Sequence, residues 1–395
     1  MSEIKTYEVQ LPTRIDFGAG RIGALAAHAR ERGKRAYLMI DPYLKGSALE
    51  NDTVAALEAA GVQARLWHDI VPNPRAETCD RAAADLLAFG ADLIIAIGGG
   101  STMDAAKAVA LVASNGGKAW QYTSRVGAEV RVPSKPGLPL IAVPTNAGTG
   151  AEVTPFAVLS NQQEKLKATI IHPFCFPALA LIDPALHVTK PARLTASTGI
   201  DTFLHAIEGY IGNRPNGWTD LFAVKAMDRT VRWLPEAVRN PGNVAVRSHM
   251  AEACYMAGIA LGSIGVGIPH ALGQALGALK DTPHGESCAA FLVATVEWTG
   301  QAAAERLARV ASLFDPSLAG RDAGEAAARL PDLLRQFFQQ VGLDADLTQL
   351  GLSEAEIGPL LDVAQRNYGF DIGCSVRTAS RSDLEWIVRN SLRPR

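Results

Sequence analysis

Four residues in the second half of the chain have the side chains and spacing of a metal site. Asp201 and His205 are four residues apart in segment 198–208, which we expect to be helical. Residues i and i+4 of a helix project from one face, so this carboxylate and this imidazole can bind one ion. His270 and His284 supply two further imidazoles. The set suits Fe2+ or Zn2+ and is too rich in nitrogen for Mg2+ or Ca2+.

A lone histidine is more often a hydrogen-bonded structural residue than a ligand, so an Asp-x-x-x-His match by itself is weak evidence. We interpret the other histidines of the chain as structural. They are His28, His68, His172, His187 and His249. A second, independent signal upstream strengthens the prediction of a metal site.

That signal is a glycine-rich turn between an apolar run and an alanine-rich segment. Residues 93–97 predict a buried parallel strand, and residues 102–114 predict a helix. Glycines let a ligand approach the backbone, and a helix N-terminus attracts a pyrophosphate. The pattern is neither a Walker motif nor a GxGxxG fingerprint, so a plain tight turn is an equally good interpretation of these residues alone. The residues concerned are Gly98, Gly99, Gly100 and Ser101.

Composition indicates an ordinary soluble enzyme-sized protein. The chain has 395 residues, of which 48% are hydrophobic and 20% charged, with a formal net charge of -2. This length suffices for two domains, and the charge gives no reason to expect binding to nucleic acid or to an anionic membrane. No apolar run approaches membrane-spanning length, and the N-terminus lacks an apolar signal segment. The five cysteines show no CxxC spacing, which favours reduced thiols and a cytoplasmic location.

The distribution of strand and helix patterns along the chain predicts two domains of different class. Alternating strand and helix patterns in the first half favour a parallel α/β sheet, and the helical patterns from residue 192 onward favour an all-helical domain. We therefore predict a Rossmann-like α/β domain at 1–185 and a helical domain at 186–395. The expected strands are 35–40, 62–67, 92–97, 138–143 and 179–182, with helices around 45–60, 76–89 and 102–114.

Three further local features are predicted. Residues 7–17 predict an N-terminal strand or hairpin, and residues 156–171 predict another hairpin around Asn161. In the helical half we expect breaks at Pro235, Pro241, Pro283 and around 317–320.

The chain resembles the iron-containing, or group III, alcohol dehydrogenases over most of its length. The similarity is strongest at 98–101, 144–154, 198–208 and 268–285, four ordered motifs at matching separations. The resemblance implies an N-terminal α/β dinucleotide domain and a C-terminal helical domain, with the active site in the cleft between them. It also implies that Asp201, His205, His270 and His284 are the four metal ligands.

The same resemblance implies a set of cofactor contacts. The glycine loop would hold the pyrophosphate, and the segment around Thr145 and Thr149 would form a second wall. Asn73 and Lys167 match positions that approach the cofactor in relatives. The full set of predicted cofactor contacts is Asp41, Asn73, Gly98, Gly99, Gly100, Ser101, Asp104, Thr145, Asn146, Thr149 and Lys167.

Asp41 bears on the choice between NAD and NADP. It ends the predicted strand 35–40, where an acidic side chain accepts hydrogen bonds from a ribose diol and repels a 2′-phosphate. Relatives with small residues here tend to use NADP, so Asp41 predicts NAD. The alternative is an aspartate that only forms a turn before Pro42.

The chain departs from its relatives at two places. Many carry a histidine four residues after the third ligand, implicated in proton release, where this chain has Gln274. An amide does not titrate near neutral pH, so the proton must leave through water, a ribose hydroxyl or another residue. The Asn-Pro-Arg of many relatives is replaced by residues 375–377, Ser-Val-Arg.

Glu208 is either a hydrogen-bond partner of a metal ligand or a residue with a helix-capping or surface role.

The implied reaction is reversible hydride transfer between a small alcohol and NAD, with the substrate oxygen on Fe2+ or Zn2+ acting as a Lewis acid. Gln274 joins the four ligands in the predicted catalytic site, and we expect a homodimer or a higher homo-oligomer. The sequence leaves the alcohol or aldehyde, the preferred direction and the choice between the two metals open.

Relatives of similar architecture supply the alternatives. Glycerol dehydrogenase keeps the chemistry, whereas dehydroquinate synthase catalyses an elimination and needs a basic phosphate site. Lys225, Arg229, Arg247 and Lys280 are the available cations, but none lies in a recognisable phosphate motif. Maleylacetate reductase usually lacks a complete ligand set, and a non-catalytic NAD- or metal-binding protein would lose a ligand. The intact set of four argues against both.

Overall fold

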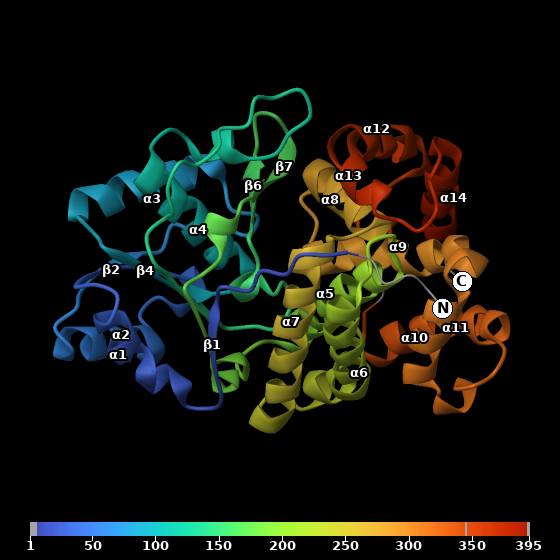
Figure 1. Cartoon of the computed structure of the whole chain (residues 1–395), viewed down its shortest axis with the longest axis horizontal. Coiled ribbons are helices and arrows are strands. Elements are labelled where there is room, and N and C mark those ends of the chain that lie inside the picture. Colours follow the sequence, from blue (N-terminus) through green and yellow to red (C-terminus); the bar gives the residue numbers. More distant parts are fainter. Residues whose placement is uncertain (1–5, 344–345, 393–395) are drawn as a thin grey trace. The chain divides into compact units, whose positions relative to one another are not determined.

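The computed structural model describes residues 6–343 and 346–392, and its contacts divide the chain into two compact units. Residues 11–189 form the sheet unit, and the residues from 190 onward form the helical unit, with which residues 6–10 group. In Figure 1 the sheet unit runs from blue to green and the helical unit from yellow-green to red. The structural division falls between Thr189 and Lys190, close to the predicted boundary at 185.

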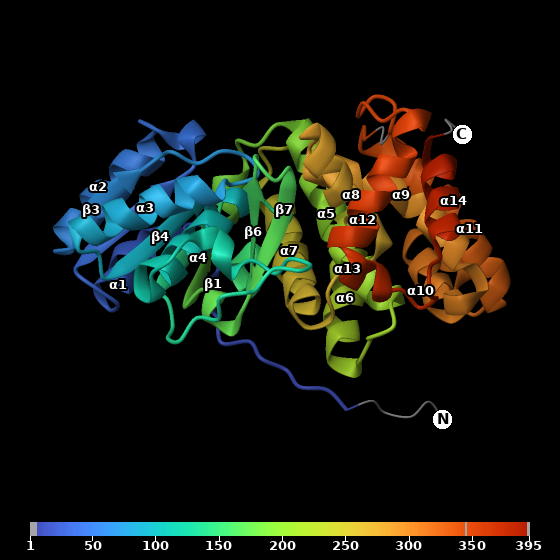
Figure 2. The ribbon, with the colours of Figure 1, turned by 90° about the horizontal axis from the view of Figure 1, so that it is seen from above.

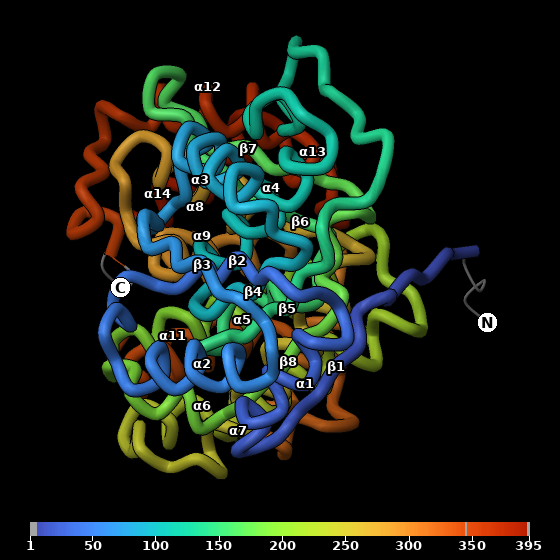
Figure 3. The backbone as a smooth tube through the Cα atoms, turned by 90° about the vertical axis from the view of Figure 1, so that its left-hand side faces the viewer, coloured from blue at the N-terminus to red at the C-terminus, as the bar shows by residue number. Residues whose placement is uncertain are grey.

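A six-stranded parallel sheet forms the centre of the sheet unit. Its strand order is β1-β8-β5-β4-β2-β3, and Figure 3 shows the strands in this succession. The four inner strands of this sheet are buried apolar runs, because helices cover both faces of the sheet. The strands are β1 Arg14–Phe17, β2 Arg35–Ile40, β3 Gln63–Trp67, β4 Leu93–Gly98, β5 Leu140–Pro144 and β8 Leu179–Ile182.

Alternate residues of the central strands enter two separate hydrophobic cores. Ile94 and Ala96 of β4 pack with helices α3 (Ala76–Phe89) and α4 (Gly100–Asn115). Ile95 and Ile97 of the same strand pack with α1 (Leu25–Arg30) and α2 (Ala48–Ala59). Successive side chains of a strand point to opposite faces, so the sheet is the middle of three layers. The predicted parallel α/β class is confirmed.

The register of β4 and β5 positions the glycine loop. Gly98 is paired with Pro144 at the carboxyl ends of these two strands. The loop that follows β4 and the loop that follows β5 therefore begin side by side. The amide of Thr145 donates a hydrogen bond of 2.9 Å to the carbonyl of Gly98, which fixes the two loops together.

Two predictions for the smaller strands have different outcomes. The hairpin predicted within 156–171 is confirmed as the antiparallel pair β6 (Phe156–Asn161) and β7 (Leu166–Ile171), seen side by side in Figure 2. At the N-terminus only Arg14–Phe17 forms a strand, and it pairs with β8 rather than with a hairpin partner. The hairpin alternative for residues 7–17 was therefore wrong.

The described residues of the second unit are mainly helical. The four predicted metal ligands lie on α5, α8 and α9, and α6 and α7 pack beside α5. The bounds are α5 Ala192–Ile211, α6 Gly217–Arg239, α7 Val244–Ile264, α8 Ile268–Lys280, α9 His284–Thr299, α10 Ala304–Phe314, α11 Ala323–Gln340, α12 Ile357–Asn367, α13 Gly369–Gly373 and α14 Arg381–Leu392.

The predicted helix breaks are correct except at one proline. Pro241 follows the end of α6, Pro283 directly precedes α9, and a 3-10 turn at 316–318 separates α10 from α11. Pro235 lies inside α6, so the predicted break there was wrong. A proline removes one backbone hydrogen bond, but Pro235 is buried, and the packing of α6 against α5 and α7 holds the helix through it.

Within the described residues, no single helix is long and apolar enough to cross a bilayer. Helices α7 and α8 pass such a test only when joined, and they bend by 97° at the break between them.

Candidate metal centre and dinucleotide loop

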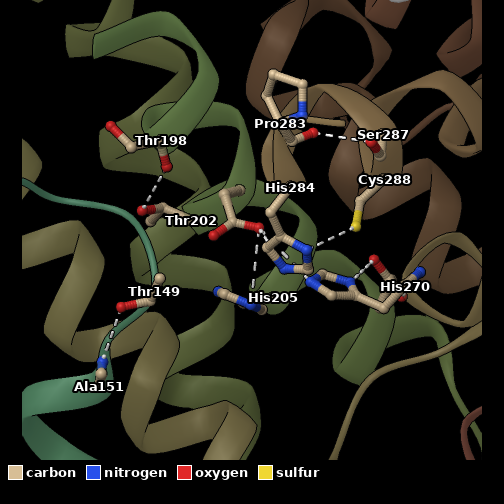
Figure 4. Close-up of polar contacts among 12 residues, drawn as sticks. Thr149, Ala151, Thr198, Thr202, His205, His270, Pro283, His284, Ser287 and Cys288 are labelled. Carbon is tan, nitrogen blue, oxygen red and sulfur yellow. Dashed lines mark hydrogen bonds and ion pairs between the residues drawn. The ribbon is translucent and has the colours of Figure 1, made fainter. Parts of the chain in front are cut away.

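The structure brings all four predicted metal ligands together. Helix α5 carries Asp201 and His205, α8 carries His270 in its first turn, and α9 begins with His284. One ligand atom from each lies within 4.8 Å of the others. Figure 4 shows the three imidazoles pointing toward a common point.

The distances between these atoms fit ligands of one ion rather than hydrogen bonds. Asp201 Oδ1 is 3.8 Å from His205 Nε2, 3.6 Å from His270 Nε2 and 3.7 Å from His284 Nε2. Two atoms that each lie about 2.1 Å from a tetrahedral ion are about 3.4 Å apart. The cluster is therefore close to the spacing that a bound ion requires.

Two atoms of the cluster are buried without a hydrogen-bond partner. They are Asp201 Oδ1 and His270 Nε2, which find no partner among the described residues and whose side chains are only 4% and 3% exposed. Leaving a buried polar atom unsatisfied costs about 1–3 kcal/mol, more when the atom is charged. A cation at this point would satisfy both atoms, so the residues present fit a divalent metal ion.

The electrostatics of Asp201 also favour a cation. Burial raises the pKa of its carboxyl group. The charges of His205 and His284 and the contact with His270 lower this pKa by more than burial raises it. The net effect holds the pKa of Asp201 well below its usual range. The side chain is therefore an ionised carboxylate, the form that binds a metal.

Glu208 holds His270 in the orientation that a metal ligand needs. Its Oε1 lies 2.6 Å from His270 Nδ1, which leaves Nε2 directed to the cluster. Its Oε2 accepts hydrogen bonds from the amides of Gly267 (2.8 Å) and His270 (3.3 Å), so it also caps the start of α8. Glu208 is 4% exposed, which excludes the surface role. Glu208 therefore both caps a helix and hydrogen-bonds one of the predicted ligands, which is His270.

The same contacts change the acidity of His270. Burial lowers the pKa of its imidazole, but the charge of Glu208, the hydrogen bond to Glu208 and the charge of Asp201 together raise it to about 10. A proton therefore occupies His270 at neutral pH when no metal is bound. Metal binding has to displace that proton.

His284 is the most exposed of the four ligands. Its side chain is 36% exposed, compared with 6% for His205 and 3% for His270. Its Nδ1 lies 3.8 Å from the thiol of Cys288, one turn further along α9 (Figure 4). A thiol is a weak hydrogen-bond partner compared with the carboxylate that holds His270.

Gln274 lies on α8 one turn after His270 and is half-buried. This places it on the same face of the helix as the ligand, and its catalytic role stays a prediction.

The sequence did not indicate that Asp371 of α13 is close to the site. Burial raises the pKa of its carboxyl group to about 7; the charge of His270 opposes this increase, and the charge of Glu208 adds to it. Asp371 is more than 100 residues from both groups in the chain, so no local sequence pattern connects it with them.

The other five histidines have structural contacts, as expected. His28 contacts Asp16, His68 contacts Glu50, His172 accepts from the amide of Phe174, His187 contacts the carbonyl of Pro144, and His249 stacks on Trp233.

Side chains of the loop after β5 pack directly against the glycine loop of the sheet unit. Gly99 is the residue before α4, and no side chain caps this helix start. A Cβ atom on Gly99 would lie 2.9 Å from Asn146 Nδ2, and one on Gly100 would lie 2.6 Å from Thr149 Cγ2. Both glycines are therefore needed for packing against two of the predicted cofactor contacts, Asn146 and Thr149.

Polar groups around this loop fit a ligand such as a pyrophosphate. The hydroxyl of Thr145 is buried and has no hydrogen-bond partner within the described part of the chain. The first turn of α4, which includes Ser101, presents backbone N–H groups and the positive end of the helix dipole. These features are the cradle that a dinucleotide phosphate requires.

Asn73 and Lys167, 94 residues apart, contact each other directly. Lys167 Nζ donates a hydrogen bond of 2.9 Å to Asn73 Oδ1, and Ser160 Oγ donates one of 2.7 Å to the carbonyl of Asn73. Asn73 has a φ of 55°, a left-handed conformation that asparagine tolerates better than most residues. The structure thus brings together two residues that were predicted to approach the cofactor.

Asp41 and Asp104 have structural contacts of their own. Asp41 Oδ1 accepts a 3.1 Å hydrogen bond from the amide of Tyr43, which is the turn-forming alternative, and its ribose contact stays a prediction. Asp104 Oδ2 accepts from the amide of Val158 at 3.1 Å, and its other oxygen is 3.9 Å from Lys107 Nζ. Burial raises the pKa of Asp104 to about 6, against the effects of Lys107 and Val158. These contacts tie α4 to β6.

Comparison with known proteins gives consistent matches over the whole chain. Residues 12–184 match the family model described as iron-containing alcohol dehydrogenase, and residues 195–390 match that of the C-terminal region of the same family. The NAD-dependent methanol dehydrogenase of Bacillus methanolicus is 31% identical, over 97% of this chain and 99% of its own. The 1,3-propanediol dehydrogenase of Klebsiella pneumoniae is 30% identical, over 92% and 93% of the two chains.

Solved structures agree with these matches. An archaeal halo-thermophilic alcohol dehydrogenase from a Red Sea brine pool has a TM-score of 0.93 and 28% identity, with coverage of 99% of this chain and 100% of that one. A 1,3-propanediol oxidoreductase has a TM-score of 0.92 and 29% identity, with coverage of 98% and 100%. The predicted architecture is therefore confirmed, and the chain belongs to the iron-containing alcohol dehydrogenase family.

Proposed function

We propose that the protein is a metal- and NAD-dependent alcohol dehydrogenase that interconverts a small alcohol and the corresponding aldehyde. The observation that carries this proposal is the cluster of Asp201, His205, His270 and His284, in which two buried ligand atoms lack a hydrogen-bond partner. In this scheme the sheet unit binds the dinucleotide, and the helical unit binds the metal and the substrate.

The helical unit would hold Fe2+ or Zn2+ through its carboxylate and three imidazoles. Such an ion supplies a Lewis acid that stabilises negative charge on a substrate oxygen. Glu208 holds His270 in the tautomer that leaves Nε2 directed to the site. Gln274 offers an amide that donates or accepts a hydrogen bond but does not carry a proton away.

The sheet unit would hold NAD at the start of α4. The glycine loop lets a phosphate approach the backbone, and Thr145 supplies a hydroxyl without another partner. Asp41 at the end of β2 favours a ribose diol over a 2′-phosphate, which supports NAD rather than NADP. The cofactor carries the hydride chemistry, and the protein supplies its orientation.

The alternative of a phosphorylated substrate is not supported by the basic residues of the helical unit. Lys225 pairs with Asp228, Arg229 with Glu252, and Lys280 with Glu356. Arg247 is buried and donates to Thr195 and to the carbonyls of Lys190 and Pro241. Each of these cations has its own protein partners, so they do not form a shared phosphate site.

The substrate is best identified by a screen that varies chain length. Relatives in the family are named for methanol, for long-chain alcohols and for choline, so family membership leaves the substrate open. Small aldehydes should be tested with NADH and with NADPH after reconstitution with Fe2+ or Zn2+, following the loss of cofactor absorbance. We expect activity with NADH that disappears on metal removal. Full turnover in the metal-free protein would contradict the proposal, and activity with NADPH alone would contradict the role of Asp41.

We further propose a cytoplasmic homodimer or higher homo-oligomer. The cytoplasmic location is supported by five cysteines that are all buried and form no disulfide among the described residues. Self-association is supported by β1, which lies at one edge of the sheet and follows the exposed Tyr7 and Val9. Light scattering after size-exclusion chromatography would give the oligomeric state, and a monomer at micromolar concentration would contradict this part.

A further inference from the structure

His284 differs from the other ligands in how it is held. Asp201 and His205 lie in the middle of α5, and His270 is held by Glu208. His284 is instead the first residue of α9, directly after a loop, and its side chain is 36% exposed. The first turn of a helix frays unless other contacts hold it. The position of His284 therefore depends on what fixes the start of α9.

Two contacts join the start of α9 to the start of α5. Arg193, in the first turn of α5, makes a bidentate pair with Glu286, with distances of 3.0 and 2.8 Å. Gly285 lies so close to α5 that a Cβ atom on it would be 2.4 Å from the carbonyl oxygen of Ser197. Helix α5 also carries Asp201, so these contacts join the helix of the first ligand to the helix of the last.

The geometry of the Arg193–Glu286 pair suits a positioning role. Glu286 is 5% exposed, and its carboxylate is two residues from His284. Arg193 reaches it from the surface with a side chain that is 79% exposed. A bidentate arginine–carboxylate pair fixes direction as well as distance, unlike a single hydrogen bond.

We propose that the Arg193–Glu286 pair is a positioning clamp that holds His284 against Asp201 and so controls how long the metal stays bound. His284 is the most exposed ligand, so the ion is released most easily by withdrawal of this imidazole. Loosening the start of α9 would raise the frequency of that withdrawal without removing any ligand. This inference rests on the proposed metal-binding function.

The chain offers a matched control on the same helix. Glu297, near the other end of α9, pairs with Arg335 of α11; both side chains are half-buried, and Arg335 also pairs with Asp332. It lies 13 residues after His284, which corresponds to about 20 Å along a helix. Breaking this second pair tests whether any loss of an arginine–glutamate contact on α9 has the same effect.

The experiment compares the full-length wild type with Arg193→Met, Arg193→Lys, Glu286→Gln and Arg335→Met, each loaded with Co2+. Release of the ion into excess chelator gives the dissociation rate, and the visible spectrum of bound Co2+ reports the ligand geometry. We expect release to become about tenfold faster in Arg193→Met and Glu286→Gln, at the low end of the effects seen for outer-sphere partners. Arg193→Lys should recover part of the wild-type rate, and Arg335→Met should release at the wild-type rate.

The double variant Arg193→Met/Glu286→Gln should release Co2+ no faster than either single variant, because both changes break one contact. The thermal midpoints of the metal-free proteins show whether Arg193→Met and Arg335→Met lose similar stability. Equal release rates and spectra in Arg193→Met and the wild type would refute the clamp while leaving the metal site intact. Failure of the wild type to bind Co2+ at all would instead refute the proposed function, and the clamp with it.

Discussion

Replacement of Glu208 by glutamine tests how far a buried carboxylate outside the ligand set determines metal binding. Glu208 accepts three hydrogen bonds, from His270 Nδ1 and from the amides of Gly267 and His270. Glutamine has the same size but only one acceptor oxygen, and its NH2 group is a donor. Both carboxylate oxygens of Glu208 accept hydrogen bonds in the wild type. Whichever way the glutamine amide is turned, its NH2 group therefore faces at least one N–H group and leaves that group without an acceptor.

The expected loss follows from these contacts. Outer-sphere partners of metal ligands typically contribute 10- to 100-fold to metal affinity. This corresponds to about 1.4–2.7 kcal/mol, comparable to the loss of one hydrogen bond to a charged group. We therefore expect Glu208→Gln to bind Zn2+ 10- to 100-fold more weakly than the wild type, measured by competition with a chromophoric chelator.

Two controls separate this effect from general damage to the fold. NAD binding, followed by fluorescence, should be unchanged because the glycine loop belongs to the other unit. Glu297→Gln removes a carboxylate of α9 that pairs with Arg335 and does not touch a ligand, and it should retain wild-type Zn2+ affinity. Wild-type Zn2+ affinity in Glu208→Gln would refute the conclusion that the carboxylate holds His270 for the metal.

Three further predictions follow from the two sites. His270→Ala should abolish alcohol oxidation in a spectrophotometric assay and leave NAD binding largely intact, and retained turnover would contradict the assigned ligand set. Because Glu208 raises the pKa of His270 to about 10, metal affinity should increase about tenfold per pH unit below that value as one proton is displaced, and an affinity independent of pH between 6 and 9 would contradict this. Gly100→Ala should weaken NAD binding at least about tenfold, since its Cβ would lie 2.6 Å from Thr149 Cγ2 and must displace the loop, and calorimetry would measure it.

The fold class and the pairing of Asp201 with His205 were predictable because they depend on local patterns. The apolar runs of β2, β4 and β5 are buried on both faces, so their composition alone indicated a parallel sheet. Asp201 and His205 share a helical turn, so their spacing indicated one binding face. Where local preference and packing disagreed, at Pro235, packing prevailed and the helix continued.

The supporting contacts were not predictable because they join residues far apart in the chain. Lys167 and Asn73 are separated by 94 residues and Arg193 and Glu286 by 93, and neither pair forms a motif. Glu208 was recognisable as a possible partner only from its closeness to His205, and the structure assigns it to His270, 62 residues away. A sequence pattern shows which side chains can act as ligands, but tertiary structure determines which groups orient them.

The charges around the site explain why a buried ion would be tolerated there. His270 lies in the first turn of α8 and His284 begins α9, and the positive ends of two helix dipoles disfavour a cation. Two buried carboxylates oppose this effect: Asp201 among the ligands, and Glu208, whose Oε2 caps the start of α8. With a divalent ion bound, their two negative charges make the centre neutral, which lowers the cost of burying it. Glu208 therefore balances charge as well as orienting His270, and its replacement by glutamine would leave one positive charge uncompensated.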